Sequence, residues 1–394
     1  MTTVRPVKRL LVVLAACSGP GAPASPDAPA DVAQDAGFPA PIALGDFAQA
    51  LDKPFIRGLQ TWLDDPTFEV KWTASLAAPI DFLGSADSAF HADLASRAAA
   101  LPGDDVLCHG DAKLDNFGWA HEDGVTLFSD ADFDDAGHCP AAADILHFVV
   151  ATDLGFADPA LDTQAIDAYV DTLASAANAI AIDATTEPVW DTLRTKGVDK
   201  ATHGDVLTIE NDIVAATADE RTALGALVAS DARFPTTLVD VAREVRTDGG
   251  SAGLRRYWLL VEDATHPRTI IELKELSPPG TELGWHGAPL DGADRFDVLK
   301  PFWWATPALG DHFEVTVLAG TFVARDRFAR ATLDPSALTA AQRANAIQAE
   351  ASLLAIKHAT AWHGDLSPLK SWLAASAQAV TARWRQAYAV AGGT

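Results

Sequence analysis

The sequence predicts an α+β protein with a mostly helical part and a β-rich part. Residues 141–182 and 218–230 are rich in alanine and place apolar side chains at helical spacing. Residues 237–330 instead contain short strand-like runs separated by glycine-rich turns. The chain has 394 residues and is 48% hydrophobic, which suffices for a large core and for two lobes.

Residues 1–16 have the features of a bacterial signal peptide. Basic residues precede an apolar run at residues 10–16, which is much shorter than the about 20 residues that a membrane-spanning helix needs. The segment Leu-Ala-Ala-Cys at 14–17 resembles the lipobox of bacterial lipoproteins. This resemblance implies cleavage before Cys17 and attachment of a lipid to its thiol.

Residues 17–42 are predicted to form a flexible tether, because they are mostly Pro, Ala, Gly, Ser and Asp. We therefore expect a protein held in the cell envelope by its lipid anchor. Ser18 resembles a signal for sorting to an outer membrane, facing the periplasm or the cell surface. The alternatives are an ordinary secretory signal and a buried N-terminal strand.

The charge of the chain excludes some partners. It carries 54 acidic and 29 basic residues, for a formal net charge of −25. Such a body repels nucleic acid and anionic lipid headgroups. We expect no nucleic-acid partner.

The section 43–236 is predicted to be the mostly helical lobe. Helical spacing is seen at 43–63 and 87–100, and short buried strands are expected at 106–108 and 125–128. Carboxylates follow both strands, which we expect to pair as a hairpin.

The section 237–330 is predicted to be the β-rich lobe and 331–394 a set of C-terminal helices. Three consecutive strands, a later hairpin and a helical break near Gly364 are expected. The strands are predicted at 238–245, 254–261, 269–273, 313–318 and 321–324.

The polar residues after the first two strands have a spacing that suits phosphoryl transfer. Asp111 ends a His-Gly-Asp tripeptide, Asn116 follows five residues later, and the next strand leads into an aspartate cluster at 130–135. Phosphoryl transfer needs a carboxylate for the acceptor hydroxyl, oxygen ligands for Mg²⁺, and donors for the phosphates. His-Gly-Asp recurs at 203–205 and 363–365 without the asparagine, so the full spacing carries the prediction.

Two alternative interpretations of the aspartate cluster explain the sequence less well than a phosphoryl-transfer site does. An EF-hand calcium loop starting at Asp130 would need Gly and Glu where the chain has Asp135 and Ala141. A solvated acidic turn explains the aspartates but not Asn116.

The segment 109–118, with Asp132 to Asp135 and Asp144 after it, resembles the bacterial domain-of-unknown-function 2252 family. Further likeness lies at 250–257 and 273–275. The resemblance implies a bilobal protein-kinase-like fold in permuted order, because the catalytic loop precedes the glycine loop and its lysine. We expect the catalytic loop and Lys274 to meet in one cleft.

The same resemblance implies roles for individual residues, with Mg²⁺ and ATP or another nucleoside triphosphate as cofactors and an unknown small-molecule or peptide hydroxyl as acceptor. It makes Asp111 the catalytic base and Asp144 its brace. It implies that Asn116, Asp132 and Asp134 bind the metal ion. It also implies that the phosphates are bound by Lys274, Gly250, Ser251 and Gly253.

Two other functions remain open on the sequence. One is a non-catalytic, pseudokinase-like envelope binding protein that uses the cleft for another ligand. The other is a metal-dependent hydrolase built on the aspartates, for which His109, His121 and His138 are close in sequence.

Cys108 and Cys139 are the cysteines left after lipidation of Cys17, in a compartment that permits disulfides. Each adjoins one half of the proposed hairpin. We therefore expect a disulfide between them, with two free buried thiols as the alternative.

We expect Cys17→Ala to release the protein from membranes or to block its processing, because the lipid is attached to this thiol. Membrane fractionation and the mass of the mature chain measure both effects. Normal processing with unchanged membrane association in the variant would contradict the anchor.

Overall fold

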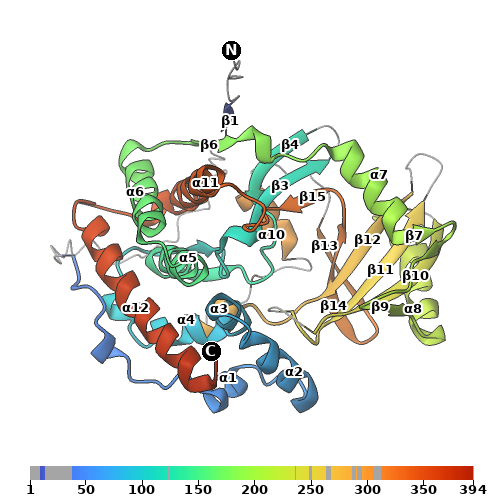
Figure 1. Cartoon of the computed structure of the whole chain (residues 1–394), viewed down its shortest axis with the longest axis horizontal. Coiled ribbons are helices and arrows are strands. Elements are labelled where there is room, and N and C mark those ends of the chain that lie inside the picture. The colour runs from blue at the N-terminus through green and yellow to red at the C-terminus, as the bar shows by residue number, and fades with distance from the viewer. Residues whose placement is uncertain are drawn as a thin grey trace, which may run out of the picture.

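The computed structural model has an α+β fold, as predicted, with helices gathered on one side and a six-stranded sheet on the other (Figure 1). It describes residues 9–13, 38–122, 125–235, 237–247, 251–262, 268–285, 290, 295–304 and 312–393. The predicted lipidation site Cys17, most of the predicted tether and the predicted phosphate-binding residue Gly250 lie outside the described residues.

The helical body is formed by helices from both ends of the chain around one apolar core. Its central helix, α5, is buried along nearly its whole length, because ten successive residues from Ala141 to Val150 are covered. The other helices pack around α5 and around one another. The members are α1 (Lys53–Leu59), α2 (Asp65–Ser75), α3 (Pro79–Ser85), α4 (Asp87–Ala95), α5 (Ala141–Phe156), α6 (Pro159–Ser175), α11 (Ala340–His358) and α12 (Leu369–Ala391).

Three of these helices begin with the same local device. Asp52, Asp64 and Asp158 precede α1, α2 and α6, and each carboxylate accepts a hydrogen bond from a backbone N–H of the first turn. A proline follows within the first two helical positions in each case, where its missing N–H costs no hydrogen bond.

The six-stranded sheet is antiparallel, in the order β13-β14-β12-β11-β10-β9. Its two faces cover separate apolar clusters, one of them packed against α8 (Ala218–Ser230). Alternation of apolar and polar side chains predicted five of the six strands. The bounds are β9 Ile213–Ala215, β10 Thr237–Val245, β11 Arg255–Glu262, β12 Thr269–Glu275, β13 Phe313–Val317 and β14 Gly320–Asp326.

The predicted hairpin between the strands at 106–108 and 125–128 is wrong. The strand β2 (Asp105–Cys108) pairs with β5 (Gly137–Pro140), whereas β4 (Val125–Asp130) pairs with β3 (Phe117–Glu122). The strand β3 follows Asn116 directly and ends only three residues before the start of β4 in the sequence, so it is the nearer partner. A third strand, β15 (Arg330–Thr332), completes the β4 sheet.

The boundaries of the predicted lobes also shift. The predicted helical stretch ends at Ser175 and continues as strand β6 (Ala179–Asp183), because the sequence alternates there despite its alanines. Helix α7 (Trp190–Ala201) and strands β7 (Thr202–His203) and β8 (Val206–Leu207) lead into β9 of the sheet.

Two helices of the predicted β-rich lobe leave the sheet. Helix α9 (Gly280–Trp285) packs against α4, and α10 (Phe296–Trp303) contributes to the core of the helical body. Gly284 permits this contact, because a Cβ there would lie 2.2 Å from the Cβ of His91.

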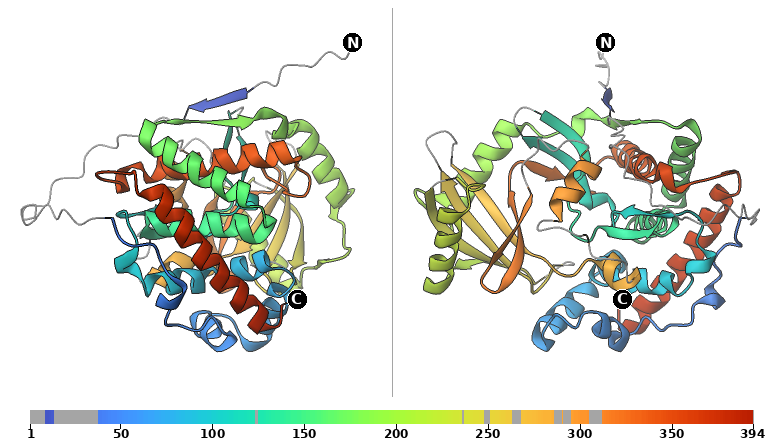
Figure 2. Two further views of the ribbon diagram at one scale, coloured as in Figure 1. Left: turned by 60° about the vertical axis from the view of Figure 1, so that its left-hand side comes forward. Right: turned by 180° about the vertical axis from the view of Figure 1, so that it is seen from behind.

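The N-terminal strand β1 (Arg9–Val13) pairs antiparallel with β6, and the two run side by side in Figure 2. It falls in the segment that the sequence assigns to the signal peptide. None of the helices in the described residues combines the length and the apolar character needed to cross a bilayer.

The predicted disulfide between Cys108 and Cys139 is confirmed. Both residues are fully buried, and their Cα atoms lie 5.8 Å apart across the β2–β5 pair. The bond links the strand before the His-Gly-Asp tripeptide to the segment after the aspartate cluster.

We expect the substitution of both cysteines, Cys108→Ala with Cys139→Ala, to lower the free energy of unfolding by about 3 to 4 kcal/mol, because the bond closes a loop of 31 residues in the unfolded chain. Urea denaturation of the variant and the parent measures the difference. Thiol titration of the denatured, unreduced chain should find no thiol beyond Cys17, and two further thiols would contradict the bond.

Candidate functional site

A cavity of about 580 Å³ lies between the six-stranded sheet and the helical body. Among the described residues, eight basic and seven acidic side chains line it, in a chain whose net charge is −25. Its environment is therefore far more basic than the rest of the protein. These side chains are Lys71, Lys113, Arg246, Arg256, Lys274, Arg325, Arg327 and Arg330, with Asp87, Asp111, Asp115, Asp132, Asp134, Asp135 and Glu272.

The His-Gly-Asp loop is held by the carboxylate of Asp144 on α5. Its two oxygens accept hydrogen bonds from the backbone N–H groups of His109 and Gly110, at 2.9 and 3.1 Å. The Nε2 of His358 lies 3.1 Å from the same carboxylate. Burial opposes the charged form, but the hydrogen bond and charge of His358 outweigh it and hold the pKa of Asp144 well below its ordinary value.

Gly110 is required in this loop for two reasons. Its φ is +88°, in the left-handed region that side chains disfavour. A Cβ at this position would also lie 2.1 Å from the carbonyl oxygen of Asp135. The tight contact brings the tripeptide against the aspartate cluster.

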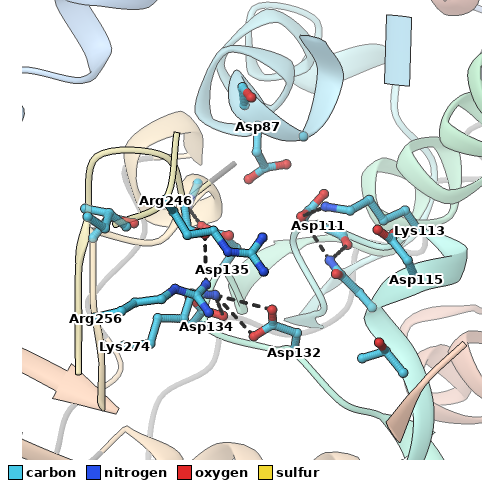
Figure 3. Close-up of a pocket in the computed structure, with 18 of the residues that line it drawn as sticks. Asp87, Asp111, Lys113, Asp115, Asp132, Asp134, Asp135, Arg246, Arg256 and Lys274 are labelled. Carbon is cyan, nitrogen blue, oxygen red and sulfur yellow. Dashed lines mark hydrogen bonds and ion pairs between the residues drawn. The ribbon is translucent and has the colours of Figure 1, made fainter. Parts of the chain in front are cut away.

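Asp111 points into the cavity beside a lysine and an amide (Figure 3). Its Oδ2 accepts hydrogen bonds from Lys113 and, at 2.9 Å, from the Nδ2 of Asn116. Burial raises the pKa of Asp111, but the charge and hydrogen bond of the Lys113 ammonium lower it, and the pKa lies below its ordinary value. The carboxylate is thus ionised at neutral pH.

Asp132 and Asp134 meet two cations from the sheet. The Nζ of Lys274 on β12 lies 3.3 Å from both oxygens of Asp132 and 2.8 Å from Asp134, and the Nη1 of Arg325 on β14 lies 2.9 Å from Asp132. Burial opposes ionisation of Asp132, but Lys274 and Arg325 hold its pKa well below the ordinary value. Burial and the charge of Asp132 raise the pKa of Asp134 to about 6.

The basic wall of the cavity is built on one face of the sheet. Glu272 and Lys274 alternate with apolar residues along β12, and the register places Glu272 opposite Arg325 and Lys274 opposite Arg256. Burial opposes ionisation of Glu272, but Arg325, Arg256 and Arg327 hold its pKa well below the ordinary value. One buried glutamate therefore orders several guanidinium groups.

Most arginines of this basic wall were not predicted from the sequence. Arg325, Arg327 and Arg330 follow one another at intervals of two and three residues, at the end of β14 and the start of β15. Their spacing, together with the alternation of charge in β12, is the signal that could have found them.

The glycine loop is only partly at the cavity. Ser251 lines it and accepts a hydrogen bond of 2.8 Å from the Nη2 of Arg256. Gly253 has a φ of +80°, and a Cβ there would lie 2.3 Å from the Cγ2 of Thr67 on α2. Its contact is with the helical body.

The histidines considered for a hydrolase do not line the cavity. His109 is buried beside Asp130, with its Nε2 3.0 Å from the carboxylate. His121 bonds to Thr126 and His138 to Asp105. His147, for which the sequence predicted no role, is the histidine nearest Asp111 among the described residues.

The donor set at the aspartate cluster fits Mg²⁺. Asn116 and Asp132 are adjacent, since the backbone N–H of Asp132 donates to the carbonyl of Asn116 at 3.2 Å. With Asp134 they offer carboxylate and amide oxygens, which hard divalent cations prefer. An ion bound there would share these carboxylates with Lys274 and Arg325.

Comparison with protein-family models, with curated proteins and with solved structures found no match to this chain. The resemblance stated from the sequence therefore stays an expectation.

We expect Asp144→Ala to destabilise the protein by about 3 to 5 kcal/mol, because it leaves two buried backbone N–H groups and His358 without their acceptor. The pKa of Asp144 is depressed in the folded chain, so its contribution is present above about pH 4 and is lost as the pH falls further. Thermal unfolding between pH 2 and pH 7 should thus show a weaker acid dependence in the variant. Asp144→Asn keeps one acceptor oxygen, so its stability should lie between that of the parent and that of Asp144→Ala. Equal stability of all three proteins would show that Asp144 does not stabilise the loop.

Proposed function

We propose that this chain is an envelope lipoprotein with a phosphotransferase site of the protein-kinase type. It would use Mg²⁺ and a nucleoside triphosphate and transfer a phosphoryl group to a hydroxyl acceptor. The observation that carries the proposal is the meeting of Lys274 with Asp132 and Asp134, more than 130 residues away along the chain, at 2.8 to 3.3 Å across the cavity. A lysine and a carboxylate pair brought together in this way can bind phosphates and their metal ion.

The charge of the cavity supports a phosphate ligand. Guanidinium groups form paired hydrogen bonds to phosphate oxygens, and Arg256, Arg325 and Arg327 lie on its wall. The chain as a whole, with a formal net charge of −25, repels anions.

The arrangement of elements supports a bilobal, permuted, kinase-like fold. A twisted antiparallel sheet carries Lys274, a helical body carries the Asp111 loop, and the cavity lies between them. The chain order is the reverse of that in ordinary kinases, since the Asp111 loop comes first.

The residues divide the chemistry as follows. Asp111, ionised at the cavity wall, takes the proton of the acceptor hydroxyl. Asn116 holds the Asp111 carboxylate through its Nδ2, which leaves its side-chain oxygen for the metal ion. Lys274 binds phosphate oxygens, and the bound Mg²⁺ supplies charge neutralisation for the transferred group. Asp144 keeps the loop in place.

A non-catalytic binding protein is the second candidate, and one observation favours it. Lys113 occupies the Oδ2 of Asp111, while Lys274 and Arg325 neutralise Asp132 and Asp134. These ion pairs compete with a metal ion and with the acceptor proton. A phosphate-bearing ligand could bind the basic wall without reacting.

We expect isothermal titration calorimetry of the purified full chain to detect the binding of Mg²⁺ together with ATP or another nucleoside triphosphate. Asp132→Ala should abolish Mg²⁺ binding, because the metal loses its main anionic ligand. Asp111→Ala should keep Mg²⁺ binding and remove any transfer to an acceptor, because this carboxylate acts on the hydroxyl.

Asp240→Ala is the matched control, since Asp240 on β10 also pairs with an arginine, Arg221 on α8, but does not line the cavity. This variant should bind Mg²⁺ and nucleotide as the parent does. Nucleotide binding with no turnover on any acceptor would favour the binding protein, and no binding of metal or nucleotide to the folded parent would refute both candidates.

A further inference from the structure

We infer that Asp87, Asp111 and His147 form a second metal site, for a divalent transition metal ion such as Zn²⁺ or Mn²⁺. One ligand atom from each residue lies within 4.8 Å of the other two. All three side chains are more than nine-tenths buried. The site shares Asp111 with the proposed phosphotransferase but none of its proposed Mg²⁺ ligands, and it does not depend on that function.

His147 presents a lone pair to this site. Its Nδ1 lies 3.0 Å from the carbonyl oxygen of Ala112, which can only accept, so Nδ1 carries the proton. In the neutral form of the ring, the proton on Nδ1 leaves the second nitrogen with a lone pair. The other nitrogen, Nε2, then has no hydrogen and faces Asp87 Oδ1 at 3.1 Å and Asp111 Oδ1 at 3.8 Å.

No donor among the described residues satisfies this group of acceptors. Both oxygens of Asp87, the Oδ1 of Asp111 and the Nε2 of His147 are buried without a hydrogen bond. Three acceptors that face one another in a buried place repel one another unless a cation or a proton lies between them. This is the observation that points to a ligand.

The neighbouring His91 provides a contrast within the same helix as Asp87. Its Nε2 donates to the carbonyl of Gly110 at 2.8 Å, and its Nδ1 accepts from the Nε1 of Trp285 at 3.0 Å. Both ring nitrogens are therefore used. His91 orients the loop, whereas His147 keeps a nitrogen available.

The carbonyl contact of His147 is the kind of support that metal-binding histidines have. A metal-bound imidazole usually donates its other N–H to a carbonyl or carboxylate, which fixes the ring and its tautomer. A set of one imidazole and two carboxylates suits first-row transition metals better than Ca²⁺, which takes only oxygen ligands.

The site is open on one side. Asp87 and Asp111 line the cavity, whereas His147 is fully covered behind them. In Figure 3, Asp87 points from its helix toward the space beside Asp111. A fourth position of the ion can therefore face the cavity and take water or a ligand oxygen. Lys113, on the Oδ2 of Asp111, is the nearest cation and leaves Oδ1 to the metal.

The test is calorimetric titration of the chelator-treated full chain with Zn²⁺ in excess Mg²⁺, which occupies the oxygen-only ligands. The parent should bind one Zn²⁺ per chain. His147→Ala and the isosteric Asp87→Asn should each weaken binding by about tenfold or more. Substitution of Co²⁺ for Zn²⁺ should give visible absorption bands in the parent that both variants lose.

Two variants act as controls. His121→Gln changes a histidine that bonds to Thr126 and does not line the cavity, and Asp132→Ala changes the proposed Mg²⁺ ligand, so both should bind Zn²⁺ as the parent does. Circular dichroism checks that each variant is folded. The site is refuted if the parent takes up no Zn²⁺, if His147→Ala and Asp87→Asn bind as the parent does, or if Asp132→Ala loses the ion equally.

Discussion

The ion pairs of Lys274 and Arg325 with Asp132 and Asp134 join the sheet to the loop that follows β4. These groups are buried or half-buried, and a buried charge is costly unless a partner neutralises it. The sheet cannot move away from the loop without leaving charges of both signs uncompensated. The position of the two parts of the fold, and hence the width of the cavity, depends on this contact.

A second set of contacts fixes the loop on the other side of the cavity. Asp144 binds the His-Gly backbone from α5, and His358 on α11 reaches the same carboxylate. The disulfide attaches β2, just before the loop, to β5 after the aspartate cluster. Asp111 is therefore held by rigid elements before any ligand arrives, which is what positioning a catalytic or binding group requires.

The sequence predicted the elements whose signals are local. Helix α8 has the predicted bounds 218–230, and the main strands of the sheet lie within two residues of their predictions, because periodicity alone identifies them. Strands β5 and β6 were missed, since Gly-His-Cys-Pro has no strand pattern and the alanines of β6 resemble a helix. The wrong hairpin followed from the same gap.

The residues of the candidate site likewise differ in whether the sequence could predict them. The spacing of Asp111, Asn116 and Asp132 is visible in the sequence because the loop is continuous, and the disulfide was predictable because few cysteines were left to pair. Arg256 on β11 and Arg325 on β14 are far apart in the sequence, and only the sheet register brings both beside β12. His147 lies in the most apolar helix of the body, where a lone histidine is ordinarily a packing residue.

Two groups of carboxylates in one cavity thus differ in how their charge is balanced. Asp132 and Asp134 have cations of the protein beside them, so an incoming metal ion competes with Lys274 and Arg325. Among the described residues, no cation forms a hydrogen bond with Asp87, and burial raises its pKa well above the ordinary value, which leaves a proton or an external cation to balance it. A cation that enters the cavity therefore meets less competition beside His147 than beside Lys274, even though the sequence motif points to the latter.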